Sequence, residues 1–137
     1  MNKKNTNIEF LYSVFLIIFS FSFNYYYGNL GVFPIDTFAF FDTAYNILLG
    51  RHLFKDIWVT TGPVVDYLQA LFFVIFGASW KSYVIHSSFL NSIICFFFFK
   101  ILIKFDLSKH LSFVYAIGLS ILCFGYCITI CGVSFAR

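Results

Sequence analysis

The sequence predicts an all-α integral membrane protein with about three transmembrane helices, plus two interfacial helices in the first external loop. Of the 137 residues, 61% are hydrophobic and 24% aromatic, whereas only 11% are charged. Soluble domains carry about a quarter of their residues as charged side chains, so this chain is too apolar to face water on all sides. Runs such as Ile93–Phe99 lack the alternation of a transmembrane barrel strand, and helices satisfy their own backbone in lipid.

The first predicted span covers about residues 10–30. It follows Lys3 and Lys4, and the segment Phe10–Tyr27 is apolar apart from serines and Asn24. A cleaved signal peptide would end in small residues, whereas here the stretch NYYYGNL follows, which is typical of a membrane interface. We therefore expect an uncleaved span with its N-terminus in the cytoplasm.

The segment Pro63–Gly77 is expected to lie in the outer interface and not to cross the bilayer. As a helix it would reach roughly 22 Å, against a hydrocarbon core of about 30 Å. If it crossed, Lys100, Lys104 and Lys109 would lie outside, against the positive-inside rule. The remaining predicted segments are a second span, a third span and one external loop, at about residues 82–104, 110–133 and 31–81.

Small and polar residues share single helical faces in the second and third spans, which predicts close helix packing. These residues are Ser87, Ser88, Asn91 and Cys95 in one span, and Ser112, Ala116 and Ser120 with Gly118, Gly125 and Gly132 in the other. The cysteines Cys95, Cys123, Cys127 and Cys131 lie in apolar runs without a histidine or carboxylate at the same depth. We expect them to pack, and not to bind metal or form disulfides.

Charged residues gather in the predicted external loop. Between Phe33 and Trp58 lie three of the six acidic residues, with three basic or imidazole side chains among them: Asp36, Asp42, Arg51, His52, Lys55 and Asp56. A charged side chain at the bilayer centre costs roughly 2.5–3.5 kcal/mol, so this stretch is expected to stay outside the hydrocarbon.

Two short helices are predicted within the loop. The first has Asp36 as its N-cap and Gly50 as its stop. Its apolar face is predicted to lie on the membrane and consists of Phe38, Phe41, Tyr45, Leu48 and Leu49. The opposite face is polar and consists of Asp42, Thr43 and Asn46. The second helix starts at Pro63 and has Asp66 near its positive end.

The order of these features resembles the polyprenol-dependent membrane glycosyltransferases of the GT-C type, especially the protein mannosyltransferase and lipid A aminoarabinose transferase group. In chain order, the pattern is an Asp, about fourteen residues, a Gly, LFKDIW, and then PVVDYLQALFFVIFG before a span. The resemblance covers about residues 8–137. The resemblance implies two juxtamembrane helices in the first external loop and an essential catalytic aspartate at Asp36, with Asp42 as the alternative. Two positions depart from the family pattern. Thr37 stands where the family has Glu, and TTGP has one proline where a Lys or His often precedes a proline pair.

The resemblance implies transfer of a sugar from a polyprenyl-phosphate donor to an acceptor hydroxyl at the outer membrane face. The lipid phosphate is already a good leaving group, so one carboxylate can serve as general base. Arg51, His52 and Lys55 are expected to contact the donor phosphate. The sequence identifies no cofactor and no metal ligand set, a divalent metal stays open, and nucleic acid is not an expected partner because the basic residues sit at the ends of spans.

Other interpretations of the same residues stay open. Asp36 can be a helix cap alone, Asp42 and Asp56 solvated loop charges, and Arg51 and Lys55 lipid-headgroup contacts. His86 is expected to be a hydrogen-bonding residue near the interface and not a catalytic group. The chain as a whole can instead be a non-catalytic multi-span subunit, or an accessory protein of a lipid-linked-sugar flippase or polymerase.

Length and composition give two further expectations. GT-C enzymes have several hundred residues and many spans, so residues 1–137 are expected to be one membrane domain at the N-terminus of a larger polytopic protein, inactive alone. Heavy use of Phe, Ile, Asn, Lys and Tyr is typical of AT-rich bacterial genomes. We therefore expect a multi-pass protein of the bacterial inner (plasma) membrane, with the loop at 31–81 on the external side.

Overall fold

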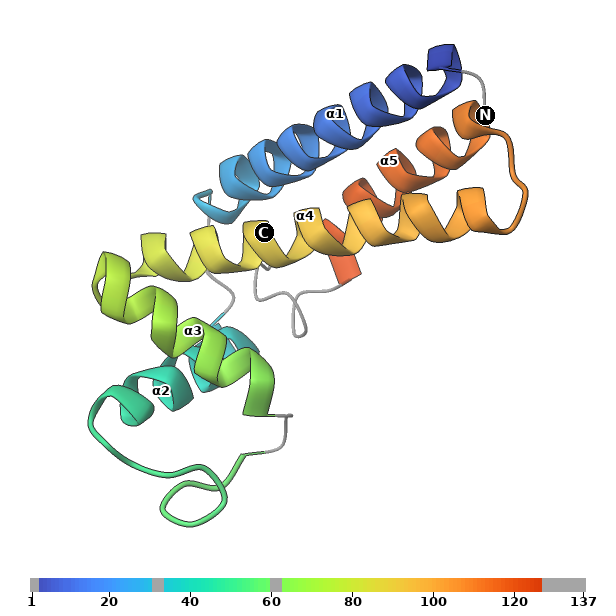
Figure 1. The fold of residues 1–137 in the computed structure, drawn as a ribbon. Helices are drawn as coiled ribbons and strands as arrows, with labels where there is room; N and C mark the ends of the chain where they lie inside the picture. The colour runs from blue at the N-terminus through green and yellow to red at the C-terminus, as the bar shows by residue number, and fades with distance from the viewer. Residues whose placement is uncertain (1–2, 31–33, 60–62, 127–137) are drawn as a thin grey trace.

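Every regular element among the described residues is an α-helix, which confirms the predicted all-helical class (Figure 1). The structure is a computed structural model that describes residues 3–30, 34–59 and 63–126, with side-chain surroundings described for 7–30, 38–59 and 63–122. Within these ranges, β-type pairing is limited to one isolated bridge between Leu53 and Ile57. The helices form two groups, one of long helices and one of short helices.

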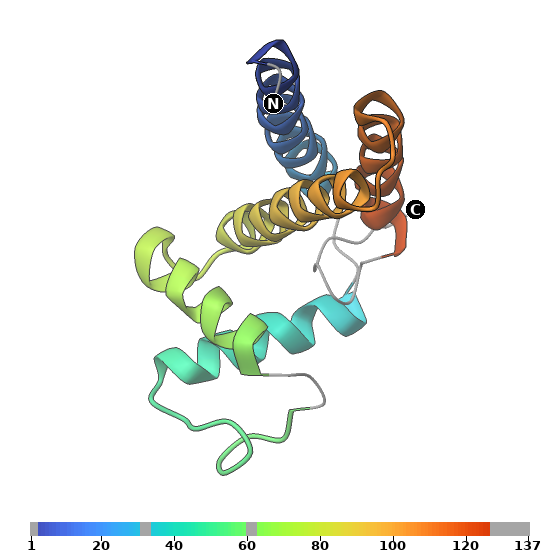
Figure 2. The same cartoon turned by 45° about the vertical axis from the view of Figure 1, so that its right-hand side comes forward.

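The three long helices form a bundle (Figures 1 and 2). α1 (Lys3–Gly28) packs against α4 (Trp80–Lys104), and α5 (Lys109–Tyr126) packs against both. α4 runs antiparallel to the other two helices, so each end of the bundle combines helix starts and helix ends.

Two of these helices are long and apolar enough to cross a membrane. They are Asn7–Gly28 within α1 and Trp80–Lys104, which is α4. The apolar part of α5, Lys109–Leu122, is shorter, and residues 127–133 of the third predicted span lie outside the described part of the chain. Two spans are therefore consistent with a membrane protein, and the predicted third span is not confirmed.

The bundle is apolar outside, and its interior combines many polar residues with an apolar cluster of Leu16, Phe99 and Ala116. The residues buried between its helices are largely small or amide-bearing: Ser13, Ser20, Asn24, Ser88, Asn91, Ser92, Ser112 and Ser120. Large apolar side chains such as Phe10 and Phe97 face outward, with exposed fractions of 71% and 57%. A soluble bundle shows the reverse arrangement, whereas membrane helices associate through small and polar residues. The predicted faces of the second and third spans are thus confirmed as packing faces over the described residues.

One predicted packing position is wrong. A Cβ atom built on Gly118 would meet no atom of the described residues within 4 Å, so this glycine does not mark a close approach to a described helix. The contact is made by neighbouring Ala116, which is fully buried against Leu16 and Phe99. Gly125 and Gly132, of the same predicted repeat, lie outside the residues whose surroundings are described.

Side-chain contacts fix which helix ends lie together. The Glu9 carboxylate of α1 pairs with Lys100 Nζ at 2.6 Å and with Lys109 Nζ at 3.1 Å. At the opposite end, the Trp80 indole N–H donates to the Gly28 carbonyl at 3.0 Å. The start of α1 therefore lies beside the end of α4, and the end of α1 beside the start of α4.

The short helices α2 (Pro34–Leu48) and α3 (Pro63–Phe76) form a second unit beside the Trp80 end of the bundle (Figure 2). They pack against each other, and α3 also packs on α4, which it crosses at a large angle. Their shared core is Ala44, Ala70 and Phe73 together with Tyr83 of α4, and it is joined by Phe41, whose ring centroid lies 4.8 Å from that of Phe73. The two predicted loop helices thus exist and lie side by side.

The start of α2 differs from the prediction. The helix begins at Pro34, so Asp36 is its third residue and not its N-cap. Proline suits the first helical position because its φ is already helical and its missing N–H would have no partner there. The side chain of Asp36 lies outside the described residues.

The packing face of α2 includes one residue that was predicted on its polar face. Thr43 is 8% exposed and Ala44 is fully buried, whereas Phe38 and Tyr45 of the predicted membrane face are 48% and 44% exposed. Because α2 is apolar on two sides, Ala44 with Phe41 covers α3 while the other apolar side stays open. α2 therefore has an apolar strip that no described residue covers.

Candidate functional site

A glycine-based cap ends α2 and turns the chain back on the helix. Gly50 has φ +81°, its N–H donates to the Ile47 carbonyl at 3.0 Å, and the Arg51 N–H donates to the Asn46 carbonyl at 3.1 Å. This pair of hydrogen bonds is a Schellman motif, which needs a left-handed residue where glycine costs least. The predicted stop at Gly50 is confirmed, and the motif returns Arg51 to the last turn of α2.

Two side-chain hydrogen bonds then join Asp42 to Arg51 through Asn46. The Asn46 Nδ2 donates to the Asp42 Oδ2 at 3.0 Å and to the Asp42 carbonyl at 2.9 Å. Arg51 Nη1 donates to the Asn46 Oδ1 at 2.9 Å. We call these three side chains the Asp42–Asn46–Arg51 strip. Asp42 and Arg51 are both exposed, so the strip offers a carboxylate and a guanidinium to the surroundings.

A tight turn follows the strip. The Asp56 Oδ2 accepts the His52 N–H at 2.8 Å, and the Asp56 N–H donates to the His52 carbonyl at 2.9 Å. Phe54 takes φ +64° at the tip, with its N–H on the Ile57 carbonyl at 2.9 Å. The carboxylate of Asp56 therefore closes a turn. Lys55 is exposed at its tip, and no ion pair among the described residues includes it.

The structure thus brings some predicted site residues together and separates others. Asp42 and Arg51 share the strip, and His52 and Lys55 lie in the turn directly after it. Asp36 precedes Asp42 by six residues in α2, which places the two positions roughly 120° apart around the helix axis. They therefore do not share a face.

Asn46 is the site residue whose role the sequence did not reveal. Its spacing of four residues from Asp42 permits a helical side-chain pair. Its contact with Arg51, however, depends on the reversal of the chain at Gly50. The spacing between Asp42 and Asn46 is visible in the sequence, but the contact of Asn46 with Arg51 follows only from the geometry of the cap.

A second polar contact lies buried between α3 and α4. The His86 Nδ1 and the Gln69 Oε1 are 2.6 Å apart, and both residues are at most 2% exposed. The His86 ring also lies 5.0 Å from that of Phe72, and the Ser82 hydroxyl donates to the Phe72 carbonyl at 3.1 Å. His86 forms a hydrogen bond, as expected. Its position indicates that it docks α3 on α4.

The described residues contain no group of three or more His, Cys, Asp or Glu side chains that could hold a metal ion. The Cys95 sulfur is buried and accepts the Ser20 hydroxyl at 3.6 Å, which is a packing contact. The other three cysteines lie outside the described side chains.

Comparison of the chain with protein-family models, with curated proteins and with solved structures found no match in any of the three.

Proposed function

We propose that this protein is a GT-C-type membrane glycosyltransferase, which moves a sugar from a polyprenyl-phosphate donor to an acceptor hydroxyl. In this proposal α1, α4 and a third span beginning with α5 cross the bacterial plasma membrane. The N-terminus is cytoplasmic, and the α2–α3 unit lies at the outer surface. Support comes from the folded unit of two short helices inserted between two membrane-length helices.

The observation that carries the proposal is the Asp42–Asn46–Arg51 strip. Sugar transfer from a lipid phosphate needs one group to take a proton and one cation to hold the departing phosphate. The strip supplies a carboxylate and a guanidinium, each fixed by a hydrogen bond to the same amide. Both are exposed beside an apolar face, as a lipid-linked substrate requires.

Distance along α2 favours one of the two aspartates as the partner of Arg51. The guanidinium is held at Asn46, which lies ten residues along α2 from Asp36, or roughly 15 Å along the axis. A base and a phosphate contact on one sugar must lie closer than this. Asp42, one turn from Asn46, meets that condition. We therefore assign the base to Asp42 in a reaction that uses Arg51, although the family resemblance favours Asp36.

The proposed step is a single inverting displacement. Asp42 accepts the proton of the acceptor hydroxyl as its oxygen bonds to the anomeric carbon. The bond between that carbon and the phosphate oxygen breaks at the same time, and the polyprenyl phosphate leaves with the electron pair. Arg51 stabilises the charge that develops on the phosphate, because a guanidinium matches phosphate oxygens in geometry and sign.

The exposed apolar strip of α2 supports a position at the membrane surface. Phe38 and Leu49 are 48% and 59% exposed, and in the following turn Phe54 and Trp58 are 62% and 87% exposed. Aromatic and apolar side chains beside charged ones are typical of a segment at the headgroup level. A polyprenyl phosphate would present its phosphate at the same level.

The test is to replace Asp42 by Asn in the chromosomal gene and to measure polyprenyl-phosphate sugars in lipid extracts by mass spectrometry. Loss of transfer should make the donor accumulate, and its mass would identify the sugar. Asp56→Asn is the matched control, because Asn keeps the acceptor that closes the turn. Unchanged donor levels in both Asp42→Asn and Asp36→Asn cells would contradict the proposal.

A further inference from the structure

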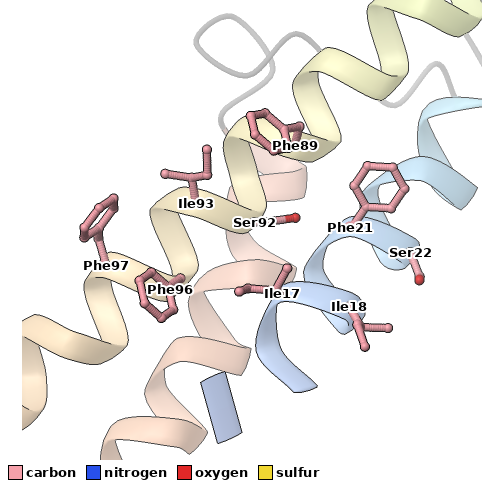
Figure 3. Close-up of a pocket in the computed structure, with 9 residues that line it drawn as sticks. All are labelled: Ile17, Ile18, Phe21, Ser22, Phe89, Ser92, Ile93, Phe96 and Phe97. Atoms are coloured by element: carbon pink, nitrogen blue, oxygen red, sulfur yellow. The ribbon is translucent and has the colours of Figure 1, made fainter. Parts of the chain in front are cut away.

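A groove runs along the outside of the bundle between α1 and α4 (Figure 3). Its volume is about 500 Å³. Its walls are almost entirely apolar, with Ile17, Ile18 and Phe21 from α1 and Phe89, Ile93 and Phe97 from α4. Ile18 and Phe97 are 59% and 57% exposed, so the groove opens to the exterior of the bundle.

The groove continues into a charged mouth at the Lys100 end. A second hollow, of about 380 Å³, shares Ile17 and Phe96 with the groove and adds Glu9, Ser13 and Lys100 to its lining. The Lys100 ammonium lies 5.5 Å from the centre of the ring of Phe96, which lines both hollows. The two adjoining hollows thus combine an apolar length with a polar end.

The mouth is lined by one carboxylate, Glu9, and one ammonium, Lys100, and neighbouring lysines make the surrounding charge positive. Glu9 is shared between Lys100 and Lys109, so Lys100 does not have a carboxylate of its own. Its side chain is still 37% exposed. Lys104, one turn further along α4, is exposed, and no ion pair among the described residues includes it. Lys100 and Lys104 would attract an anionic lipid headgroup.

The length of the groove matches the hydrocarbon thickness of one leaflet of a bilayer. From Phe89 to Lys100 is eleven residues of helix, or roughly 16 Å. Half of a hydrocarbon core of about 30 Å is roughly 15 Å. A chain that starts at the mouth would therefore reach the middle of the bilayer at the far end of the groove.

We propose that this groove binds one acyl chain of an anionic glycerophospholipid, with the lipid phosphate held against Lys100. Basic pockets between membrane helices are a known way of binding acidic headgroups, and the long apolar walls suit a saturated or singly unsaturated chain. The proposal rests on α1 and α4 crossing a bilayer. It is independent of the glycosyltransferase proposal, because it concerns the end of the bundle opposite α2 and α3.

The test is native mass spectrometry of the delipidated 137-residue chain, titrated with phosphatidylglycerol and phosphatidylcholine of identical acyl chains. The wild-type protein should bind phosphatidylglycerol more tightly by about fivefold, the effect expected for one lysine near an acidic lipid. Lys100→Gln should abolish this preference. Lys81→Gln, at the opposite end of α4, is the charge-matched control and should leave the preference unchanged.

Glu9→Gln separates binding from a merely structural ion pair. Removing the carboxylate leaves Lys100 and adds to the positive charge, so the preference for phosphatidylglycerol should rise, opposite to the effect of Lys100→Gln. If both variants shift the preference in the same direction, or if wild type binds both lipids equally, the proposal is wrong.

Filling the groove tests the acyl-chain contact. Ser22→Trp places an indole in the groove and should weaken both lipids, whereas Leu11→Trp, 64% exposed and outside both hollows, should weaken neither. A second copy of the chain is the competing occupant. A dimer in detergent that Ser22→Trp dissociates, without any lipid preference in wild type, would overturn the assignment to lipid.

Discussion

Asn91 of α4 donates a hydrogen bond from its Nδ2 to the Oδ1 of Asn24 on α1, at 2.7 Å, inside the bundle. Both residues are at most 1% exposed. The Asn24 Nδ2 is also used, because it donates to the Ser20 carbonyl at 2.8 Å. Two amides thus join the membrane-length helices at a depth where neither can reach water.

The first prediction concerns this amide pair. Asn91→Ala should lower the free energy of unfolding by about 1 kcal/mol, because polar contacts between membrane helices contribute roughly 0.6–2 kcal/mol. The measurement is titration with sodium dodecyl sulfate in mixed micelles, followed by circular dichroism. Asn24→Ala and the double variant complete a cycle. Additive effects of the two substitutions would show that the contact has no energetic role.

The second prediction concerns the cap of α2. Gly50→Ala should destabilise the end of α2 by roughly 1–2 kcal/mol, which is the free-energy cost of the left-handed conformation for a residue with a Cβ atom. Hydrogen exchange of amides near Ile47 should become faster. Gly118→Ala is the matched control, because both glycines have open space around Cβ but Gly118 lies within α5 without a positive φ. That control should be neutral or stabilising.

The third prediction separates Asp56 from the strip. Asp56→Ala should make trypsin cleave after Lys55 about tenfold faster, because a hydrogen bond to a charged group is worth roughly 1.5–3 kcal/mol and the turn opens without it. Asp56→Asn keeps an acceptor but loses the charge, so its cleavage rate should lie between those of wild type and Asp56→Ala. Equal protection of Asp56→Ala and wild type would show that the carboxylate does not hold the turn.

The fourth prediction concerns orientation in the membrane. In a background without native cysteines, Lys55→Cys should react with an impermeant thiol reagent added to intact cells, and Lys104→Cys should not. Both positions are exposed on the protein, so a difference reports the side of the membrane. Labelling of both, or of Lys104→Cys alone, would contradict the proposed topology.

The positions of the helices followed from local signals in the sequence. Gly50 and Pro63 mark a helix end and a helix start whatever their tertiary surroundings, because they act through backbone conformation. The same reasoning misplaced the start of α2, since both Pro34 and Asp36 are good starting residues at different positions of the first turn. Which of them begins the helix is not a local property.

The packing face of α2 and the role of Asn46 required the tertiary structure. α2 has apolar residues on two sides, so its own pattern does not tell which side meets Phe73 of α3. Similarly, Asn46 contacts Arg51 only because the chain reverses at Gly50. The charged residues of the site were visible in the sequence, but their pairing depends on the path of the chain.

The last prediction concerns Asn46 as a positioning residue. Asn46→Ala leaves Asp42 and Arg51 in place in the sequence but removes the amide that holds both, so the base and the phosphate contact lose their fixed separation. Loss of a general base costs roughly 10²–10⁴-fold in rate, and loss of its orientation should cost less, about tenfold.

The measurement is again the amount of polyprenyl-phosphate sugar in lipid extracts, now compared among three strains. Less donor should accumulate in the Asn46→Ala strain than in the Asp42→Asn strain. The double variant should match Asp42→Asn alone, because the position of residue 42 no longer matters once its side chain cannot accept a proton. Asn29→Ala is the matched control: like Asn46, Asn29 is a helical-end amide that donates to the carbonyl four residues earlier, at 2.6 Å, but it lies away from the strip. If Asn29→Ala and Asn46→Ala have equal effects, the amide acts on helix stability and not on the geometry of the site.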